Sequence, residues 1–289
     1  MEIREPERLT PVVGEADVIV VGSGPGGLSA AIAAARAGVS VILIERFGCF
    51  GGNITSVGVE GFAWYRHENT IEAGGLAFEY EQRAIESNAA VPESQSKSYE
   101  LDSEGFKVVA DNLVLKAGVR PMLHRAFCAP ILDGDEIKGV ITESKAGREA
   151  IIGKIIIDAT GDADVARRSG VKVFKNKKED MISASVMFHM SGVNKEEFMN
   201  EIERDPQKYS DWSDKNWQVQ TSGKEDDMFS PFLRKPFEKA KDSGLIDSDL
   251  QTISGTWGAI HDTGELTYLN LVHLNLSLIH ISEPTRPSS

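Results

Sequence analysis

Two short apolar runs flank an alanine-rich segment near the start of the chain. Residues 17–21 read DVIVV and residues 39–44 read VSVILI, a pattern typical of strands that are buried on both faces of a sheet. Residues 28–37 lie between them and are rich in alanine, a good helix former, and Gly38 ends that segment. The pattern predicts a βαβ unit whose two strands are parallel.

The next part of the chain predicts helices and then a β-meander. Helical spacing of apolar residues covers residues 75–90 and 103–117, and a short strand is expected over residues 119–124. Residues 127–152 form strand-like runs separated by the turn sequences DGD and AGR, which predicts antiparallel hairpins. A further apolar strand over residues 154–159 precedes a short helix at 162–169.

Beyond residue 171 the pattern changes to a mixed α+β one. Strands are expected over residues 183–190, 252–260 and 265–271, helices over 195–204 and 231–243, and a polar loop over 207–228.

Composition and charge restrict the class of protein. The chain has 289 residues, enough for one large domain or two ordinary ones, with 41% hydrophobic and 26% charged residues, as in a soluble globular protein. Its formal charge of -13 argues against nucleic acid and anionic membranes as partners, which bind clustered lysine and arginine. Two distant cysteines and the lack of a long apolar run lead us to expect a cytoplasmic protein without a membrane span.

A glycine-rich turn follows the first strand and opens the first helix. Residues 22–27 read GSGPGG, the spacing in which one glycine makes the turn, the next allows a pyrophosphate close to the backbone and the last allows close helix–strand packing. The second strand ends in Glu45, where a carboxylate accepts hydrogen bonds from a ribose 2′-hydroxyl and repels a 2′-phosphate. The whole set predicts a dinucleotide site that includes Gly22, Gly24, Pro25, Gly26, Gly27 and Glu45.

Two later motifs bear on which dinucleotide is bound. RFGCFGGNIT begins at Arg46, and IIIDATGD ends at Asp162. Together with VIVVGSGPGGLSAAIAAARAG, they resemble the FAD-dependent oxidoreductase family of glutathione-reductase-like flavoproteins. The layout is also similar to the flavoprotein subunits of fumarate and succinate oxidoreductases, and the resemblance extends from Asp17 to about Ser191.

The resemblance implies FAD as the cofactor and further residues that contact it. The loop with Arg46, Gly51, Gly52 and Asn53 would lie along the pyrophosphate and ribityl chain, and the backbone at Ala126 would meet the adenine. The turn Thr160, Gly161, Asp162 would close on the dinucleotide. The family also implies a C-terminal stretch that returns to the flavin ring, and this chain stops before it.

The expected fold class is α/β, with a Rossmann-like FAD-binding domain and a mixed α+β substrate domain that is truncated at the C-terminus. The FAD-binding domain is expected over residues 14–170, with a helical insertion at 62–117 and the β-meander at 127–152, and a partial substrate domain over 171–275. Residues 276–286 read LSLIHISEPTR and resemble a translated sequencing adapter, so residues 276–289 are interpreted as an artefact.

Residues for the substrate side are less clearly marked. Arg66 and His67 are candidates for binding an anion or transferring a proton, although a solvated loop is the favoured alternative. His189 is expected to be a packed strand residue, His261 is a similar candidate, and Cys49 has no neighbouring cysteine for a dithiol relay. The sequence contains no cysteine-rich cluster that would indicate a metal site.

The sequence therefore predicts an FAD-dependent oxidoreductase acting on a small molecule by transfer of a hydride or an electron pair. Two alternatives stay open, an NAD-linked dehydrogenase and a non-catalytic dinucleotide-binding protein.

Overall fold

The computed structural model describes residues 3–4, 6–62, 65–67, 70–71, 73–92, 99–175, 177, 184–204, 209–210, 232–233, 239–245, 263–274 and 286–287. The chain divides into two compact units. Unit 1 comprises residues 1–52, 107–175 and 283–289, and unit 2 comprises residues 53–106 and 176–282. Within the described part, no helix has both the length and the apolar character needed to cross a bilayer.

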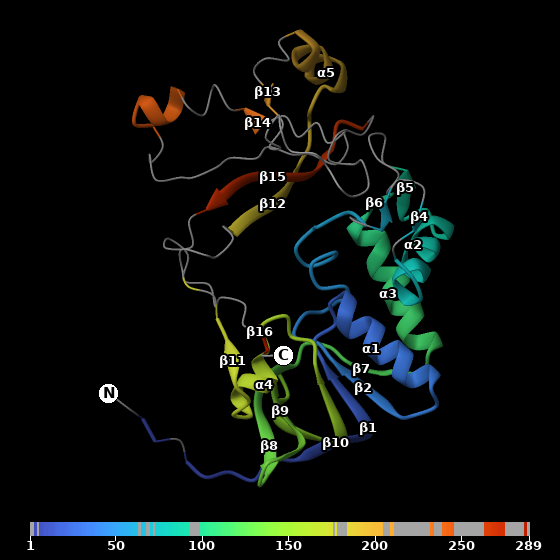
Figure 1. Cartoon of the computed structure of the whole chain (residues 1–289), viewed down its shortest axis with the longest axis vertical. Helices are drawn as coiled ribbons and strands as arrows, with labels where there is room; N and C mark the ends of the chain where they lie inside the picture. Colours follow the sequence, from blue (N-terminus) through green and yellow to red (C-terminus); the bar gives the residue numbers. More distant parts are fainter. Residues whose placement is uncertain are drawn as a thin grey trace. The chain divides into compact units, whose positions relative to one another are not determined.

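Unit 1 is built on a six-stranded sheet with the order β7-β2-β1-β10-β9-β8 (Figure 1). Its strands are β1 (Val12–Val21), β2 (Val41–Ile44), β7 (Arg120–Met122), β8 (Ala126–Asp133), β9 (Glu136–Ser144) and β10 (Gly147–Asp158). The first four strands in this order are parallel, and β10, β9 and β8 form an antiparallel meander. The predicted α/β class, with a Rossmann-like parallel sheet and a β-meander, is confirmed.

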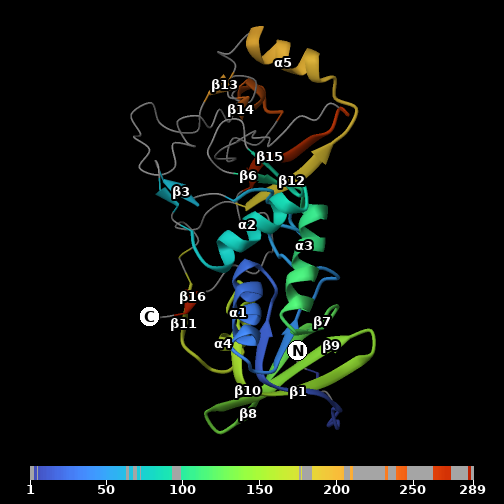
Figure 2. The same cartoon turned by 90° about the vertical axis from the view of Figure 1, so that its right-hand side faces the viewer.

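Both faces of the central strands are covered. On one face Ile19 and Val21 of β1 join Ile42 and Ile44 of β2 in the core, together with Val165 of α4 (Asp164–Arg168). On the other face lies α1 (Pro25–Arg36), which packs along β1 and β2 and is seen beside them in both views (Figures 1 and 2). Its buried side chains include Leu28, Ala31 and Ile32. Burial on both faces explains why the strand sequences are continuously apolar.

One prediction within the sheet is wrong in detail. The meander's last strand and the apolar strand at residues 154–159 are a single strand, β10, which pairs with β9 at its start and with β1 along its length. Gly153 lies between the two predicted strands, and a Cβ at Gly153 would lie 2.7 Å from the Ile19 side chain. Glycine is therefore needed there for packing of β1 against β10, not for a turn.

Unit 2 contains several small antiparallel pairs and helices. Its strand pairs are β3 (Arg66–His67) with β4 (Thr70–Ile71), β5 (Ala90–Pro92) with β6 (Tyr99–Leu101), β12 (Ala184–Met190) with β15 (Leu266–Leu274), and β13 (Tyr209–Ser210) with β14 (Phe232–Leu233). The helices are α2 (Leu76–Glu86), α5 (Lys195–Arg204) and the first turn of α3 (Ser103–Lys116), which continues into unit 1. The rings of Phe62 and Tyr80 each meet Phe106 edge to face at 6.1 Å, forming a small aromatic core.

The strands expected at residues 183–190 and 265–271 are confirmed, and they pair with each other. The helix expected over 231–243 is wrong at its start, because Phe232–Leu233 form a strand and helical backbone covers only 239–242 of the described residues. The strand expected at 252–260 lies outside the described residues, as does most of the expected loop. In unit 1, β11 (Val173–Phe174) pairs with β16 (Arg286–Pro287), the described part of the adapter-like segment.

Candidate functional site

The carboxyl ends of four parallel strands meet at one edge of the sheet in unit 1. The segments that leave this edge are the glycine turn after β1, the loop after β2, the connection after β7 and the turn after β10. Open α/β sheets bind ligands at this edge, beside the strand where the order of connections reverses. Here β1 is that strand, because the chain runs from it to β2 on one side while β10 lies on the other.

Two glycines of the turn are required by the fold itself. Gly22 has a φ of +98°, and a Cβ there would overlap the carbonyl of Ala159 at the end of β10. A Cβ on Gly27 would overlap the carbonyl of Gly22. These two positions bring α1 close to the sheet, as their spacing predicts.

For the other two glycines of the turn, no contact with the described residues explains why a side chain is absent. A Cβ at Gly24 or Gly26 would meet no heavy atom within 4 Å. Gly24 has a φ of -60° and a ψ of 177°, a conformation open to any residue. Pro25 and Gly26 are exposed, so the turn has open space in front of it. An absent side chain facing open space is what the approach of a pyrophosphate to the backbone requires.

The start of α1 is suited to an anion. Gly24 is the N-cap and Pro25 follows at N1, with no side-chain hydrogen bond at the cap and no acidic residue in the first turn. The first N–H groups of a helix lack intrahelical partners and carry the positive end of the helix dipole. A phosphate at this place would accept those N–H groups without any cationic side chain.

The second glycine-rich loop lies directly against the turn. The N–H of Gly51 donates to the carbonyl of Ser23 at 2.9 Å, and a Cβ at Gly52 would lie 2.7 Å from the Cα of Gly24. Gly52 also has a φ of +54°. The structure thus brings together two loops that the sequence assigned to one cofactor. Asn53 is the first residue of unit 2, where its carbonyl accepts a hydrogen bond from Val59 N–H.

Glu45 is buried at the end of β2 and its carboxylate faces the glycine turn. Oε2 accepts hydrogen bonds from the Ser23 N–H at 2.9 Å and from the Ser23 hydroxyl at 2.5 Å, and Oε1 accepts from the Phe47 N–H at 2.9 Å. A carboxylate has about four acceptor positions. Three donors therefore leave room for about one more, which suits a single ribose hydroxyl. The sequence did not mark Ser23, because the middle residue of a Gly-x-Gly motif carries no signal of its own.

The turn after β10, which contains the predicted residues Thr160, Gly161 and Asp162, is held by Asp158. Asp158 Oδ1 accepts from the N–H and hydroxyl of Thr160, and Oδ2 accepts from Ala166 N–H in α4. The Thr160 hydroxyl in turn accepts from Asp164 N–H at 3.0 Å, and Gly161 has a φ of +84°. Asp158 lies within the motif IIIDATGD, but sequence reasoning gave it no role.

Asp162 has an unfavourable environment for a charge. Burial, with the like charges of Asp164 and Asp158, raises the pKa of the Asp162 carboxyl, and the Arg46 guanidinium acts in the opposite direction. Arg46 also lies over the ring of Phe47, at 4.7 Å from its centroid. The predicted residues Arg46 and Asp162 are thus electrostatically coupled within unit 1.

Ala126 is the exposed first residue of β8, immediately after a link to Glu45. The N–H of Arg125 donates to the Glu45 carbonyl at 2.9 Å, and the N–H of Glu45 donates to the Met122 carbonyl at 2.9 Å. The backbone that leads into Ala126 is therefore held beside the end of β2.

The candidates for the substrate side are more scattered. Arg66 and His67 form the short strand β3 in unit 2, and their roles stay predictions. His189 is not the packed strand residue that was expected, because its side chain is 48% exposed. His261 lies outside the described residues. Neither Cys49 nor Cys128 is in a disulfide, and no metal-binding group of three or more His, Cys, Asp or Glu occurs among the residues that are described.

Comparison with known proteins decides the family. Residues 17–270 match the family described as FAD dependent oxidoreductase, which is most of the chain. The chain belongs to this family. The predicted flavoprotein family and its cofactor, FAD, are thereby confirmed over the NAD-linked alternative.

Curated relatives of this family member have different activities. Thiamine thiazole synthase of Saccharolobus islandicus is 30% identical over 171 residues, which cover 55% of this chain and 60% of the relative. Digeranylgeranylglycerophospholipid reductase 2 of Methanopyrus kandleri is 30% identical over 192 residues, which cover 63% of this chain and 46% of the relative. The chain therefore spans about half of the length of these relatives.

Similar solved structures include a geranylgeranyl bacteriochlorophyll reductase-like protein from Thermoplasma acidophilum. It has a TM-score of 0.45 and 21% identity and covers 63% of this chain and 48% of that one. Glycine oxidase from Geobacillus kaustophilus has a TM-score of 0.39 and 11% identity, covering 56% and 60% of the two chains.

Proposed function

We propose that unit 1 binds the adenine dinucleotide half of FAD, and that the protein transfers a hydride or an electron pair between a small-molecule substrate and the flavin. The observation that carries this proposal is the open space in front of Gly24 and Gly26, where an added Cβ would meet no atom of the described residues within 4 Å. It lies at the start of α1, which has no side-chain cap, and beside a buried acid that ends β2.

Each part of the edge has a separate task in this proposal. The N–H groups at the start of α1 hold the pyrophosphate, while Gly51 and Gly52 line its other side. Glu45 accepts one ribose hydroxyl, and the backbone before Ala126 lies beside the adenine. The turn at Thr160 and Gly161 closes the edge at β10. FAD, when bound, supplies the redox chemistry, and these residues only position it and exclude water.

The substrate is proposed only as a small molecule. The two curated relatives are named for a thiazole synthase and for a lipid reductase, and these names do not share a substrate class. Arg66 and His67 remain the proposed residues on the substrate side. A cytoplasmic location, without nucleic acid as a partner, is proposed from the acidic charge and the two distant cysteines.

The decisive experiment compares two glycine substitutions in the full chain. Gly24→Ala places a methyl group in the open space where the pyrophosphate would lie. Gly74→Ala is the matched control, because a Cβ at Gly74 also meets nothing within 4 Å. FAD affinity is measured by titration of the apoprotein, with flavin absorption and fluorescence as readouts, and stability by thermal melting.

We expect Gly24→Ala to weaken FAD binding by about ten- to hundredfold, as for an overpacked contact, while its melting temperature stays within the range of the control. Equal FAD affinity in both variants would contradict the proposal. If the chain binds FAD but no reductant or substrate bleaches the flavin absorption, the result would instead support the non-catalytic alternative.

A further inference from the structure

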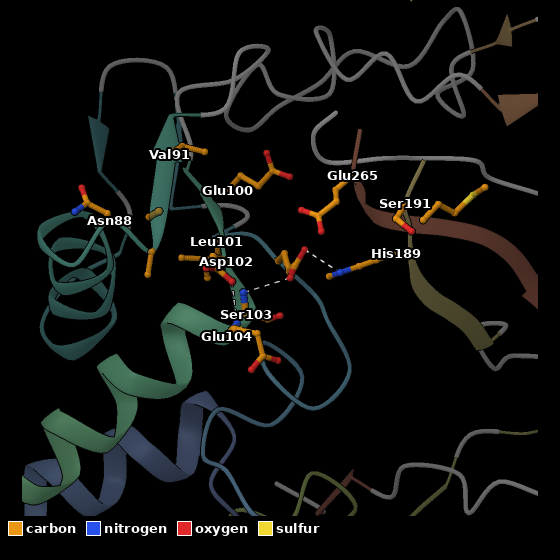
Figure 3. A pocket seen from close by; sticks show the side chains of 14 residues that line it. Asn88, Val91, Glu100, Leu101, Asp102, Ser103, Glu104, His189, Ser191 and Glu265 are labelled. Atoms are coloured by element: carbon orange, nitrogen blue, oxygen red, sulfur yellow. Dashed lines mark hydrogen bonds and ion pairs between the residues drawn. The ribbon is translucent and has the colours of Figure 1, made fainter. Parts of the chain in front are cut away.

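A cavity of about 570 Å³ lies within unit 2, apart from the residues assigned to FAD. Its wall is formed by Glu60, by the chain from Asn88 to Val91, by the end of β6 and the start of α3, and by residues that end β12 and precede β15 (Figure 3). Sites for small molecules have volumes in this range, with an apolar wall and a few convergent polar groups. Here the apolar part is given by Ala89, Val91 and Leu101.

The main polar feature of the wall is a pair formed by Glu60 and His189. The Glu60 side chain is only 4% exposed, and its Oε1 accepts a hydrogen bond from the N–H of Ser103, the first residue of α3. Its Oε2 lies 3.3 Å from Nε2 of His189. A dashed line at His189 in Figure 3 marks this interaction. A buried carboxylate is stable only when it is paired in this way. Glu60 therefore fixes the orientation of the imidazole.

The His189 ring can also contact a ligand in the cavity. Its side chain is 48% exposed and lines the cavity. With Nε2 directed at Glu60, the second ring nitrogen, Nδ1, is the one that remains for a hydrogen bond with a ligand.

The charges around the cavity decide which ligand it attracts. Among the described residues of its wall, five carry carboxylates, namely Glu60, Glu100, Asp102, Glu104 and Glu265, and His189 is the one basic residue. In Figure 3 the side chains of Glu100, Glu265 and Asp102 lie around the same space as His189. Such a wall repels carboxylates and phosphates and attracts an ammonium group.

We propose that this cavity binds a small organic molecule that carries a protonated amino group. The ammonium group lies among the carboxylates, and Nδ1 of His189 forms a hydrogen bond with the ligand while Glu60 holds the ring in place. Glu60 is thus a positioning residue and His189 a ligand-binding one. No residue of the cavity wall is among those assigned to FAD.

The test uses three probes of similar length and different charge: 1,4-diaminobutane, 1,4-butanediol and succinate. Each is titrated into the full chain with ¹⁵N-labelled histidine, and the ring nitrogens of His189 are followed by NMR, with assignment through His189→Gln. We expect saturable shifts with the diamine and none with the diol or succinate. Glu60→Gln should weaken diamine binding by about tenfold or more, as for loss of a charged hydrogen bond.

Glu86→Gln is the matched control, because Glu86 is an acid on the exposed surface of α2 that does not line the cavity. It should leave diamine affinity unchanged. The protein is strongly acidic, so equal weakening by Glu60→Gln and Glu86→Gln would show diffuse attraction of cations and overturn the proposal. Shifts that are the same for all three probes, or absent for the diamine, would also overturn it. If Glu60→Gln does not fold, the test uses His189→Gln, which replaces an exposed side chain. Loss of thermal stabilisation by the diamine in this variant would support the proposal, and persistence of that stabilisation would overturn it.

Discussion

At the scale of single residues, the contact between Ser23 and Glu45 is the one that most directly shapes the proposed ribose contact. Both side chains are buried, and the serine donates twice to the same carboxylate oxygen, from its N–H and from its hydroxyl. The hydroxyl is therefore expected to hold Glu45 in the orientation that leaves its last acceptor position toward the ligand.

Ser23→Ala tests this expectation. Removing the hydroxyl should lower FAD affinity by about tenfold, because a hydrogen bond to a charged group is worth about 1.5–3 kcal/mol. The measurement is a fluorescence titration with FAD, repeated in Glu45→Gln and in the double variant. Additive effects of the two substitutions would show that Ser23 does not act through Glu45.

A second expectation concerns Asp17 at the start of the parallel pair. Its carboxylate accepts from Lys154 Nζ at 2.6 Å and from the N–H and hydroxyl of Ser40 at 3.0 and 2.6 Å. The hydrogen bond from Lys154 is the largest cause that holds the pKa of Asp17 well below its usual range, followed by those from Ser40. A folded-state pKa below the unfolded one gives stability that is present at neutral pH and is lost as the pH falls.

Asp17→Asn should therefore lower the melting temperature at pH 7, and the difference from the parent should shrink once the pH falls below about 4, the usual pKa of aspartate. Thermal melts at a series of pH values measure this. The exposed turn residue Asp135 gives the control Asp135→Asn, for which no such trend is expected. A difference that stays constant from pH 7 to pH 3 would contradict the assignment.

At this scale the sequence identified some residues and missed others for clear reasons. Gly22, Gly27 and Glu45 were predictable because strand, turn and helix impose their spacing. Asp158 and His189 were not, since Asp158 acts on α4 through the turn and His189 meets Glu60 from a distant part of the chain. Patterns along a sequence do not report such pairings.

At the scale of elements, β10 connects the parallel part of the sheet with the meander. Its last residue, Asp158, binds both the Thr160 turn and the start of α4, a helix of only 5 residues. A helix this short is stabilised chiefly by its end contacts and packing, not by helix propensity.

Asp158→Ala should remove three hydrogen bonds at once and lower the free energy of unfolding by about 1–3 kcal/mol. Urea denaturation followed by circular dichroism measures it. Asp135→Ala, in the exposed turn between β8 and β9, should change that free energy by no more than about 0.5 kcal/mol. Equal stability of the two variants would mean that α4 and its turn do not need Asp158.

The elements themselves were largely predictable from periodicity, and their lengths were not. The predicted first strand begins at residue 17, but β1 begins at Val12, because polar and small residues there still pair with β10. The two strands predicted on either side of Gly153 are one strand, and a Cβ at Gly153 would lie against the Ile19 side chain of β1.

At the scale of the whole molecule, each of the two units is assembled from separated segments of the chain. Residues 53–106 group with residues 176–282, whereas the sequence placed most of them as an insertion within an FAD-binding domain. Only contacts between distant segments define such units, and a single sequence does not contain them. The domain boundaries at residues 170 and 275 stay predictions.

The division into units leads to an expectation about where FAD acts. A ligand that binds only the folded state stabilises it by mass action, and the segments in direct contact lose local opening most strongly. FAD should therefore slow amide hydrogen exchange in three separate segments of unit 1: the glycine turn at 22–27, the loop at 45–52 and the turn at 159–162. These segments are remote in sequence, and only a common ligand at the sheet edge would protect all three together.

Hydrogen exchange followed by mass spectrometry measures this in the full chain with and without FAD. The Gly24→Ala protein serves as the control at the same FAD concentration, and it should show little protection in any of the three segments. Protection of one segment alone would mean that the loops do not share a ligand. Protection confined to β12 and β15 would place the dinucleotide in unit 2, and the assignment of the glycine turn to the pyrophosphate would then be wrong.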